Sequence, residues 1–301
     1  MSIFIGSGTA VCTPFSQTGA FNPDAYEKLI DFQIRNNTDA IVSCGTTGEI
    51  STLSPEEHVD VVAAAKVFTT AANAKYKKSV PVIAGAGGND TAGCIKKGKA
   101  LIQAGADALM YTTPYYNKTS QKGLVAHFTA IANAVDAPIV LYNIPGRTGM
   151  NMSAITLAEL AKVPNIVAIK EASGDFGLVA EMAERAGDAV DIYSGNDDYI
   201  VPVLSLGGKG VITTIGNIAP QTVHDMVDLY LKGDVVSSRK LQLSILPMVR
   251  HIFADVNPIP IKAALNVMGF DMGDCRLPLI ACDDALIEKM KTQMHIMGIL
   301  S

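Results

Sequence analysis

The sequence predicts an α/β fold: one (β/α)8 TIM barrel formed by residues 1–233, followed by an all-helical extension, residues 234–301. Two observations carry this prediction. Short apolar runs rich in β-branched residues alternate with longer helical patterns, and eight such units in roughly 230 residues are typical of a closed barrel. The runs are almost continuously apolar, as expected of parallel strands that are buried on both faces.

The predicted strands are short runs of Val, Ile, Leu and Ala. Because parallel strands need a crossover, and the crossovers here have helical periodicity, we expect the strands to form one parallel sheet. They are Thr9–Thr13, Ala40–Cys44, Val80–Ala84, Ala108–Thr112, Pro138–Tyr142, Ile166–Lys170, Asp191–Ser194 and Gly210–Thr214.

The predicted helices have apolar residues at three- and four-residue spacing. Ser54-Pro55-Glu56-Glu57 supplies an N-cap, a first-turn proline and two first-turn acids. Helical patterns end at Gly105, Gly187 and Gly233. In the barrel they include Asp24–Arg35, Glu56–Ala74, Thr91–Ala104, Gln121–Ala134 and Phe176–Ala186, and in the extension they are Val235–Ala254, Pro260–Val267 and Asp284–Met297.

The alternative fold is an open, doubly wound sheet. Its usual fingerprint, G-x-G-x-x-G, is missing, because Asp90 stands where the third glycine of the run that begins at Gly85 belongs. After Gly233 no strand pattern separates the helical segments, and no linker-like stretch precedes them. We therefore expect the extension to pack on the barrel rather than to move as an independent domain.

The composition limits the partners of the protein. A net charge of −5 and a pI near 5.5 argue against a nucleic-acid partner. No apolar run approaches the roughly 20 residues that cross a bilayer, and the first residues do not form a signal peptide. Five widely spaced cysteines without a C-x-x-C pair favour a reducing compartment. We expect a cytoplasmic protein with no membrane partner.

Motifs for metals and cofactors are missing. The five histidines form no H-x-H or H-E-x-x-H pair, so no metal site is predicted. Neither a P-loop nor a G-x-S-x-G elbow occurs. With no cofactor expected, a lysine in the active site is the simplest electron sink.

Lys170 is the first candidate for chemistry, because it ends an apolar strand where a barrel carries its catalytic groups. Burial lowers the pKa of a lysine, and a partly neutral lysine is a nucleophile towards ketones. An ordinary ion pair with Glu171 is the alternative. Tyr142 ends the preceding strand, so it lies beside Lys170 at the same depth, although a plain core tyrosine would have the same pattern.

Three loops after strands carry polar residues. Gly45-Thr46-Thr47-Gly48-Glu49 offers backbone and hydroxyl donors that suit a carboxylate. Thr113-Pro114-Tyr115-Tyr116-Asn117 carries two adjacent tyrosines, which more often mark an interface than a catalytic site. Arg147 lies on the loop after Tyr142, where a guanidinium can bind a carboxylate with two hydrogen bonds. Each loop alone is weak evidence.

Together these motifs resemble the dihydrodipicolinate synthase family of the N-acetylneuraminate lyase superfamily, over essentially the whole chain. Five segments match in order: Gly45–Glu49, Thr113–Asn117, Tyr142–Gly149, Ile169–Gly174 and Asn257–Pro260. The resemblance implies condensation of pyruvate with L-aspartate-4-semialdehyde, without a cofactor, in a homo-oligomer built as a dimer of dimers. The alternative is a sister lyase that acts on sialic acid or a 2-keto-3-deoxy sugar acid, and a non-catalytic pyruvate-binding barrel is a third possibility.

The resemblance also implies the roles of single residues. Lys170 would form the imine with pyruvate, and Tyr142 would be the acid and base at that carbon. Thr46 and Tyr116 would complete a proton relay, with Tyr116 reaching into a neighbouring subunit. Four further residues would bind substrate: Thr47 and Ile212 hold pyruvate, Arg147 holds the carboxylate of the semialdehyde, and Gly195 offers its carbonyl near Lys170.

The resemblance carries one departure from relatives that are inhibited by lysine. Those relatives often have a histidine at position 55 and a glutamate at position 93, where this chain has Pro55 and Gly93. Neither replacement can pair with a lysine amine. We therefore expect inhibition by lysine to be weak or absent.

Overall fold

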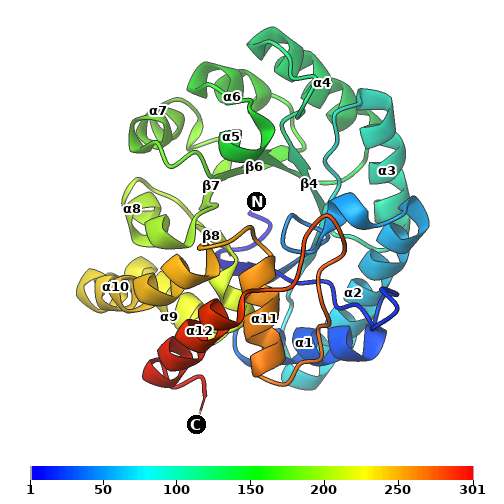
Figure 1. Ribbon diagram of the computed structural model, residues 1–301. Coiled ribbons are helices and arrows are strands. Elements are labelled where there is room, and N and C mark those ends of the chain that lie inside the picture. The colour runs from blue at the N-terminus through cyan, green and yellow to red at the C-terminus, as the bar shows by residue number, and fades with distance from the viewer. Residues whose placement is uncertain (1, 301) are drawn as a thin grey trace.

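The computed structural model describes residues 2–300 and contains a closed barrel of eight parallel strands. Figure 1 looks along the barrel, with helices surrounding the strands. The predicted TIM barrel is confirmed, and the open sheet is wrong, because β1 pairs with β8 as well as with β2. The strands are β1 Gly6–Ala10, β2 Ala40–Ser43, β3 Val82–Gly85, β4 Ala108–Thr112, β5 Ile139–Asn143, β6 Ile166–Glu171, β7 Asp191–Ser194 and β8 Gly210–Thr213.

Most helices of the barrel begin at a residue whose side chain caps the first turn. Ser54 accepts a hydrogen bond from the backbone N–H of Glu57, whose side chain accepts one from the N–H of Ser54, so α2 begins with a capping box. The helices are α1 Pro23–Arg35, α2 Pro55–Tyr76, α3 Thr91–Gln103, α4 Gln121–Ala134, α5 Pro145–Thr148, α6 Ala154–Leu160, α7 Phe176–Ala186, α8 Ile200–Ser205 and α9 Pro220–Leu231, with single 3₁₀ turns at Ile50–Thr52, Asp197–Tyr199 and Ile215–Asn217.

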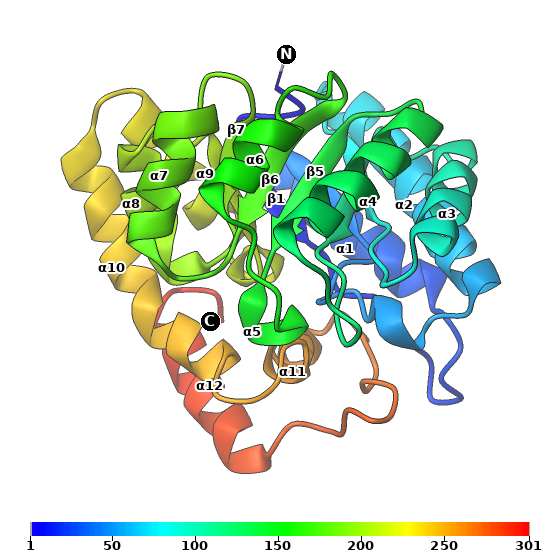
Figure 2. The same ribbon diagram turned by 90° about the horizontal axis from the view of Figure 1, so that it is seen from above.

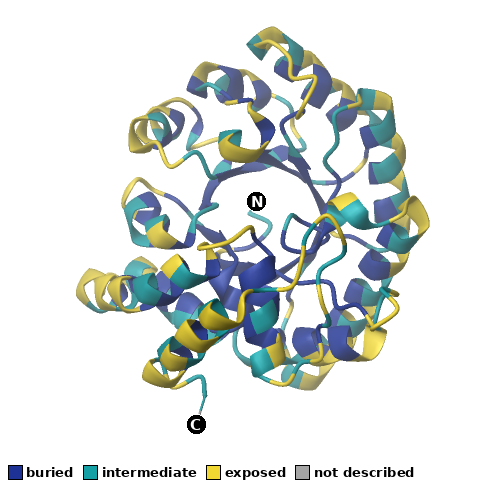
Figure 3. Ribbon diagram, in the orientation of Figure 1, coloured by how far each residue is buried: buried dark blue, intermediate teal, exposed yellow. Residues whose placement is uncertain are grey.

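The core has two layers. One lies between the strands and the surrounding helices, and the other fills the inside of the barrel. Figure 3 shows this arrangement, with buried strands inside helices that are exposed on their outer faces. The ring of Phe4 stacks on that of Tyr193 inside the barrel, with centroids 4.4 Å apart, and the Tyr193 hydroxyl donates to the Phe4 carbonyl at 2.6 Å. This aromatic pair closes the end of the barrel from which the strands begin.

The first strand lies three residues earlier than predicted, at Gly6–Ala10 rather than Thr9–Thr13. Small residues are needed there, because a Cβ on Gly8 would stand 2.9 Å from the ring of Phe4. The β-branched residues that suggested the later boundary follow the strand and remain buried, as Val11 does. Close packing around Phe4 therefore overrides β-propensity at this position.

The extension consists of three helices, α10 Val235–Ile252, α11 Ile259–Val267 and α12 Asp284–Ile296. In the described part of the chain, no strand follows Thr213. Figure 2 shows α5 and α11 at one end of the barrel and the N-terminus at the other. Residues 268–283, which we call the strap, join α11 to α12. The division between barrel and extension at residue 233 stays a prediction.

No helix among residues 2–300 has the length and apolar character that crossing a membrane requires.

Candidate active site

Lys170 and Tyr142 lie side by side inside the open end of the barrel. They are directly paired residues of β6 and β5, which confirms that both lie at the same depth. Each side chain is buried, with 5% and 4% of its surface exposed. The Lys170 Nζ lies 4.4 Å from the centre of the Tyr142 ring, where an ammonium is attracted to the aromatic face.

The surroundings of Lys170 favour its neutral amine. Burial is the main cause that lowers the pKa of Lys170, and with the opposing effect of Asp197 and the smaller lowering by Arg147 the pKa is about 8. One pH unit below such a pKa, roughly one lysine in ten is a free amine, compared with far fewer for an ordinary lysine. Lys170 is therefore poised to attack a carbonyl carbon at neutral pH.

Glu171 does not neutralise Lys170 in an ion pair. Its carboxylate accepts hydrogen bonds from Asn143 Nδ2 at 2.8 Å and from the backbone N–H of Ser173 at 2.5 Å. Successive residues of a strand point to opposite faces, so Glu171 faces the surrounding helices and Lys170 faces the inside of the barrel. The ion-pair interpretation of Lys170 is therefore wrong.

Tyr142 keeps its phenolic proton. Burial raises its pKa well above the usual range, although the Arg147 charge and a hydrogen bond with Thr46 partly oppose this effect. A protonated phenol next to an amine can donate its proton to a leaving oxygen and can take a proton back. The Thr46 hydroxyl offers the next position along a proton path.

The loop after β2 brings two threonines to the same end. Thr46 lines the cavity described below. Thr47 is buried, and its hydroxyl accepts a hydrogen bond from Asn257 Nδ2 at 3.0 Å. Because the amide occupies one lone pair of that oxygen, the Thr47 proton is free to be donated elsewhere.

Arg147 lies in the short helix α5 rather than on an open loop. Pro145 at the start and Gly149, in the left-handed region at φ +65°, confine this helix to a single turn. The guanidinium donates from Nη2 to the Asn257 carbonyl at 3.2 Å. Its remaining donors are available to a carboxylate.

A cavity of about 380 Å³, large enough for a small organic acid, lies beside these side chains. Thr46, Tyr142, Arg147 and Asn257 line it. Lys170 and Thr47 are not among its lining residues, but Lys170 lies against the Tyr142 ring and Thr47 is bonded to Asn257. Within residues 2–300, no group of three or more His, Cys, Asp or Glu side chains is arranged to hold a metal ion.

Comparison with known proteins decides the family. The model of the dihydrodipicolinate synthetase family matches residues 3–297. The chain belongs to this family.

Members of the dihydrodipicolinate synthetase family resemble this chain over its full length. A 4-hydroxy-tetrahydrodipicolinate synthase of Lachnoclostridium phytofermentans is 49% identical over 100% of both chains. A solved dihydrodipicolinate synthase of Acinetobacter baumannii, complexed with pyruvate, is 37% identical with a TM-score of 0.93, and covers 98% of this chain and 99% of its own. One from Cyanidioschyzon merolae with lysine bound is 36% identical with a TM-score of 0.94 and covers 100% of both. The chain is thus a lyase of the class I aldolase type.

Three residues that the family resemblance singled out, Tyr116, Ile212 and Gly195, make no polar side-chain contact with Lys170 or Tyr142. Tyr116 is 92% exposed, does not line the cavity, and has a left-handed backbone at φ +69°. Ile212 is fully buried inside the barrel on β8. Gly195 follows β7, where a Cβ would stand 2.6 Å from that of Ala172, so only glycine fits.

Sequence reasoning missed three residues of this dihydrodipicolinate synthetase site. Asn257 contacts both Thr47 and Arg147, and Asp197 is a buried acid close enough to act on Lys170. Lys262 is fully buried and pairs with Glu49, the last residue of the threonine loop. A lysine inside the largely apolar helix α11 was a usable signal, whereas nothing in the local sequence distinguished the other two.

Proposed function

We propose that the cavity catalyses the reaction of a 4-hydroxy-tetrahydrodipicolinate synthase, the condensation of pyruvate with L-aspartate-4-semialdehyde. The observation that carries the proposal is the buried Lys170, with its lowered pKa, in contact with Tyr142. The names of relatives with 47–49% identity support the same substrates.

The steps follow from the chemistry of a free amine and a phenol. The Lys170 amine attacks the keto carbon of pyruvate, and Tyr142 supplies the proton with which the oxygen leaves as water. The resulting imine withdraws electrons, so the methyl group loses a proton and becomes an enamine carbon nucleophile. This carbon attacks the aldehyde, and the amine of the second substrate then displaces Lys170 as the ring closes.

The other residues hold substrate in this proposal. Thr47 and Ile212 bind pyruvate, and the Gly195 carbonyl faces the region of Lys170. Arg147 binds the carboxylate of the semialdehyde, for which a guanidinium is the best-matched partner. These assignments rest on the resemblance and on the position of each residue around the open end of the barrel.

Tyr116 completes the relay of Thr46 and Tyr142 only if a second copy of the chain supplies it. Its exposure of 92% in a strained backbone conformation supports a role across an interface rather than within one chain. We therefore propose a homodimer as the catalytic unit, assembled further into a dimer of dimers.

The test compares three reactions of the purified protein, one condensation and two cleavages. Product formation from pyruvate and L-aspartate-4-semialdehyde is measured beside cleavage of sialic acid and of a 2-keto-3-deoxy sugar acid. We expect turnover of the first pair only, since Arg147 and the two threonines suit a semialdehyde that carries a carboxylate. Cleavage of a sugar acid without condensation would assign the chain to the sister lyases.

A further inference from the structure

The threonine loop has an unfavourable backbone conformation at both ends. Cys44 and Glu49 flank residues 45–48, and both have a left-handed conformation with φ +54°. This conformation is uncommon for residues other than glycine, asparagine and aspartate, and it persists only where surrounding contacts enforce it. The loop that carries Thr46 and Thr47 must therefore be held from outside.

The side chain of Glu49 is the point at which the extension holds this loop. Its Oε1 accepts from Lys262 Nζ on α11 at 2.8 Å, and its Oε2 accepts from the backbone N–H of Arg276 in the strap at 2.9 Å. Only 1% of each charged side chain is exposed. Lys262 also donates to the Asp274 carbonyl at 2.9 Å, so both charges have partners.

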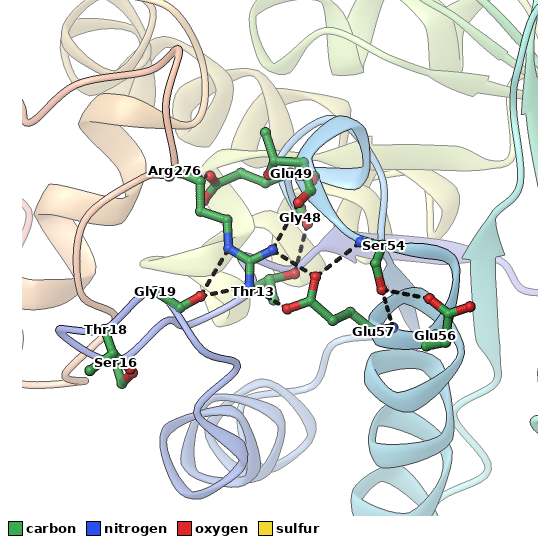
Figure 4. A network of polar contacts seen from close by, with 11 residues as sticks. Thr13, Ser16, Thr18, Gly19, Gly48, Glu49, Ser54, Glu56, Glu57 and Arg276 are labelled. Carbon is green, nitrogen blue, oxygen red and sulfur yellow. Dashed lines mark hydrogen bonds and ion pairs between the residues drawn. The ribbon is translucent and has the colours of Figure 1, made fainter.

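A second group of contacts fixes the strap itself. Figure 4 shows the Arg276 guanidinium between Glu57 of α2 and the Gly19 carbonyl. The same guanidinium lies 4.1 Å from the centre of the Phe15 ring, and Lys262 Nζ lies 4.2 Å from that centre. The two cations and Phe15 therefore tie the strap and α11 to the loops around the open end of the barrel.

A buried ion pair usually contributes little net free energy to the stability of the folded state. Removing two charges from water is costly, and replacing such a pair with apolar residues is often neutral or stabilising. The ion pair between Lys262 and Glu49 instead fixes a geometry. That geometry is the conformation of the loop that carries Thr46 and Thr47.

We propose that Glu49 is a positioning residue for Thr46 and Thr47, with Lys262 as its anchor. The extension is then part of the catalytic apparatus, because α11 holds the loop at Glu49 and the adjacent Asn257 holds it at Thr47. This inference rests on the proposed function, since it assigns the loop to catalysis of the condensation.

The test separates geometry from stability. Lys262→Met leaves a buried carboxylate without its partner, so we expect the Tm to fall by roughly 10 °C and kcat to fall about 10²-fold, because small misplacements of catalytic groups have such effects. Glu49→Met combined with Lys262→Met removes both charges. The Tm should then recover most of the loss, whereas kcat should stay about 10²-fold low. Recovery of kcat together with the Tm would overturn the inference.

Lys66→Met is the matched control. Lys66 pairs with Asp107, at the end of the barrel where β4 begins, and not with the threonine loop or the strap, so kcat should change less than about twofold. Trapping with borohydride and pyruvate keeps the readout informative if the single variant folds poorly. The double variant should still be labelled at Lys170, because only the loop has moved. If the wild-type protein itself is neither labelled at Lys170 nor active in the condensation, the proposed function is overturned instead.

Discussion

Lys170 is buried inside the barrel, and this burial favours its neutral amine, the form that can act as a nucleophile. Burial, rather than a neighbouring base, is the first cause of its lowered pKa. The adjacent charges then adjust the value in opposite directions, Arg147 downwards and Asp197 upwards. The pH dependence of the reaction should report this balance.

Imine formation should rise with pH as Lys170 loses its proton. With a pKa of about 8, the rate at limiting pyruvate should increase roughly fivefold from pH 7 to pH 8 and level off above about pH 9. Stopped-flow or quenched borohydride trapping measures this rate. A rise of tenfold per unit that continues to pH 10 would show that Lys170 has the pKa of an exposed lysine.

Removing the Asp197 charge should move this profile. The carboxylate raises the pKa of Lys170, so Asp197→Asn should lower that pKa and shift the midpoint of the profile to lower pH. The amide keeps the shape of the side chain but accepts less strongly from the N–H groups of Thr214 and Ile215. A midpoint that stays in place, in a folded variant, would contradict the electrostatic role.

Tyr142→Phe removes the phenolic proton and leaves the packing intact. We expect kcat to fall roughly 10²-fold, because acid–base help by one side chain has about this value. Tyr111→Phe is the control, since Tyr111 is equally buried but lies between barrel and helices, away from the cavity. Equal losses in the two variants would assign the Tyr142 effect to folding.

Some residues of the candidate site could be predicted from the sequence, and others could not. Lys170 and Tyr142 could be predicted because each polar group ends an apolar run, and strand ends of parallel neighbours meet at one edge. Asn257 could not, because its partners Thr47 and Arg147 lie 210 and 110 residues away and its own surroundings have no periodicity. Asp197 follows β7 like many ordinary acids, and only burial distinguishes it.

At the scale of elements, the repeated strand and helix patterns were sufficient for topology but not for boundaries. The register of β5 against β6 agrees with the expectation, whereas β1 is displaced because Gly8 must pack against Phe4. The four-residue helix α5 was missed because its single turn is too short for a periodic pattern. That turn nevertheless sets the direction of Arg147.

The loop of residues 113–119 is the element that we expect to work across an interface. Tyr116→Phe and Lys170→Ala should each be slow, but mixing the two proteins under subunit exchange should restore part of the activity. Recovery occurs because one site of the mixed dimer holds both intact residues. Persistent inactivity, with exchange within the dimer demonstrated, would exclude Tyr116 from the neighbouring site.

At the scale of the whole molecule, the fold is shared with a relative solved with lysine bound. Pro55 is the first residue of α2 and Gly93 the third of α3, and neither side chain can pair with an amine. A lost charge-assisted hydrogen bond of about 1.5–3 kcal/mol weakens binding roughly 10- to 100-fold. Initial rates should therefore change little at millimolar lysine. Half-inhibition well below one millimolar would show recognition by other groups.

The central claim, an imine between pyruvate and Lys170, is tested most directly by reduction with borohydride followed by peptide mass mapping. We predict one pyruvate-dependent adduct, on the peptide that contains Ala168-Ile169-Lys170, and none when pyruvate is omitted. Lys262 is the other deeply buried lysine and serves as an internal control, because its ion pair with Glu49 keeps it away from substrate. An adduct on Lys262 or on a surface lysine, with Lys170 unmodified, would contradict the account.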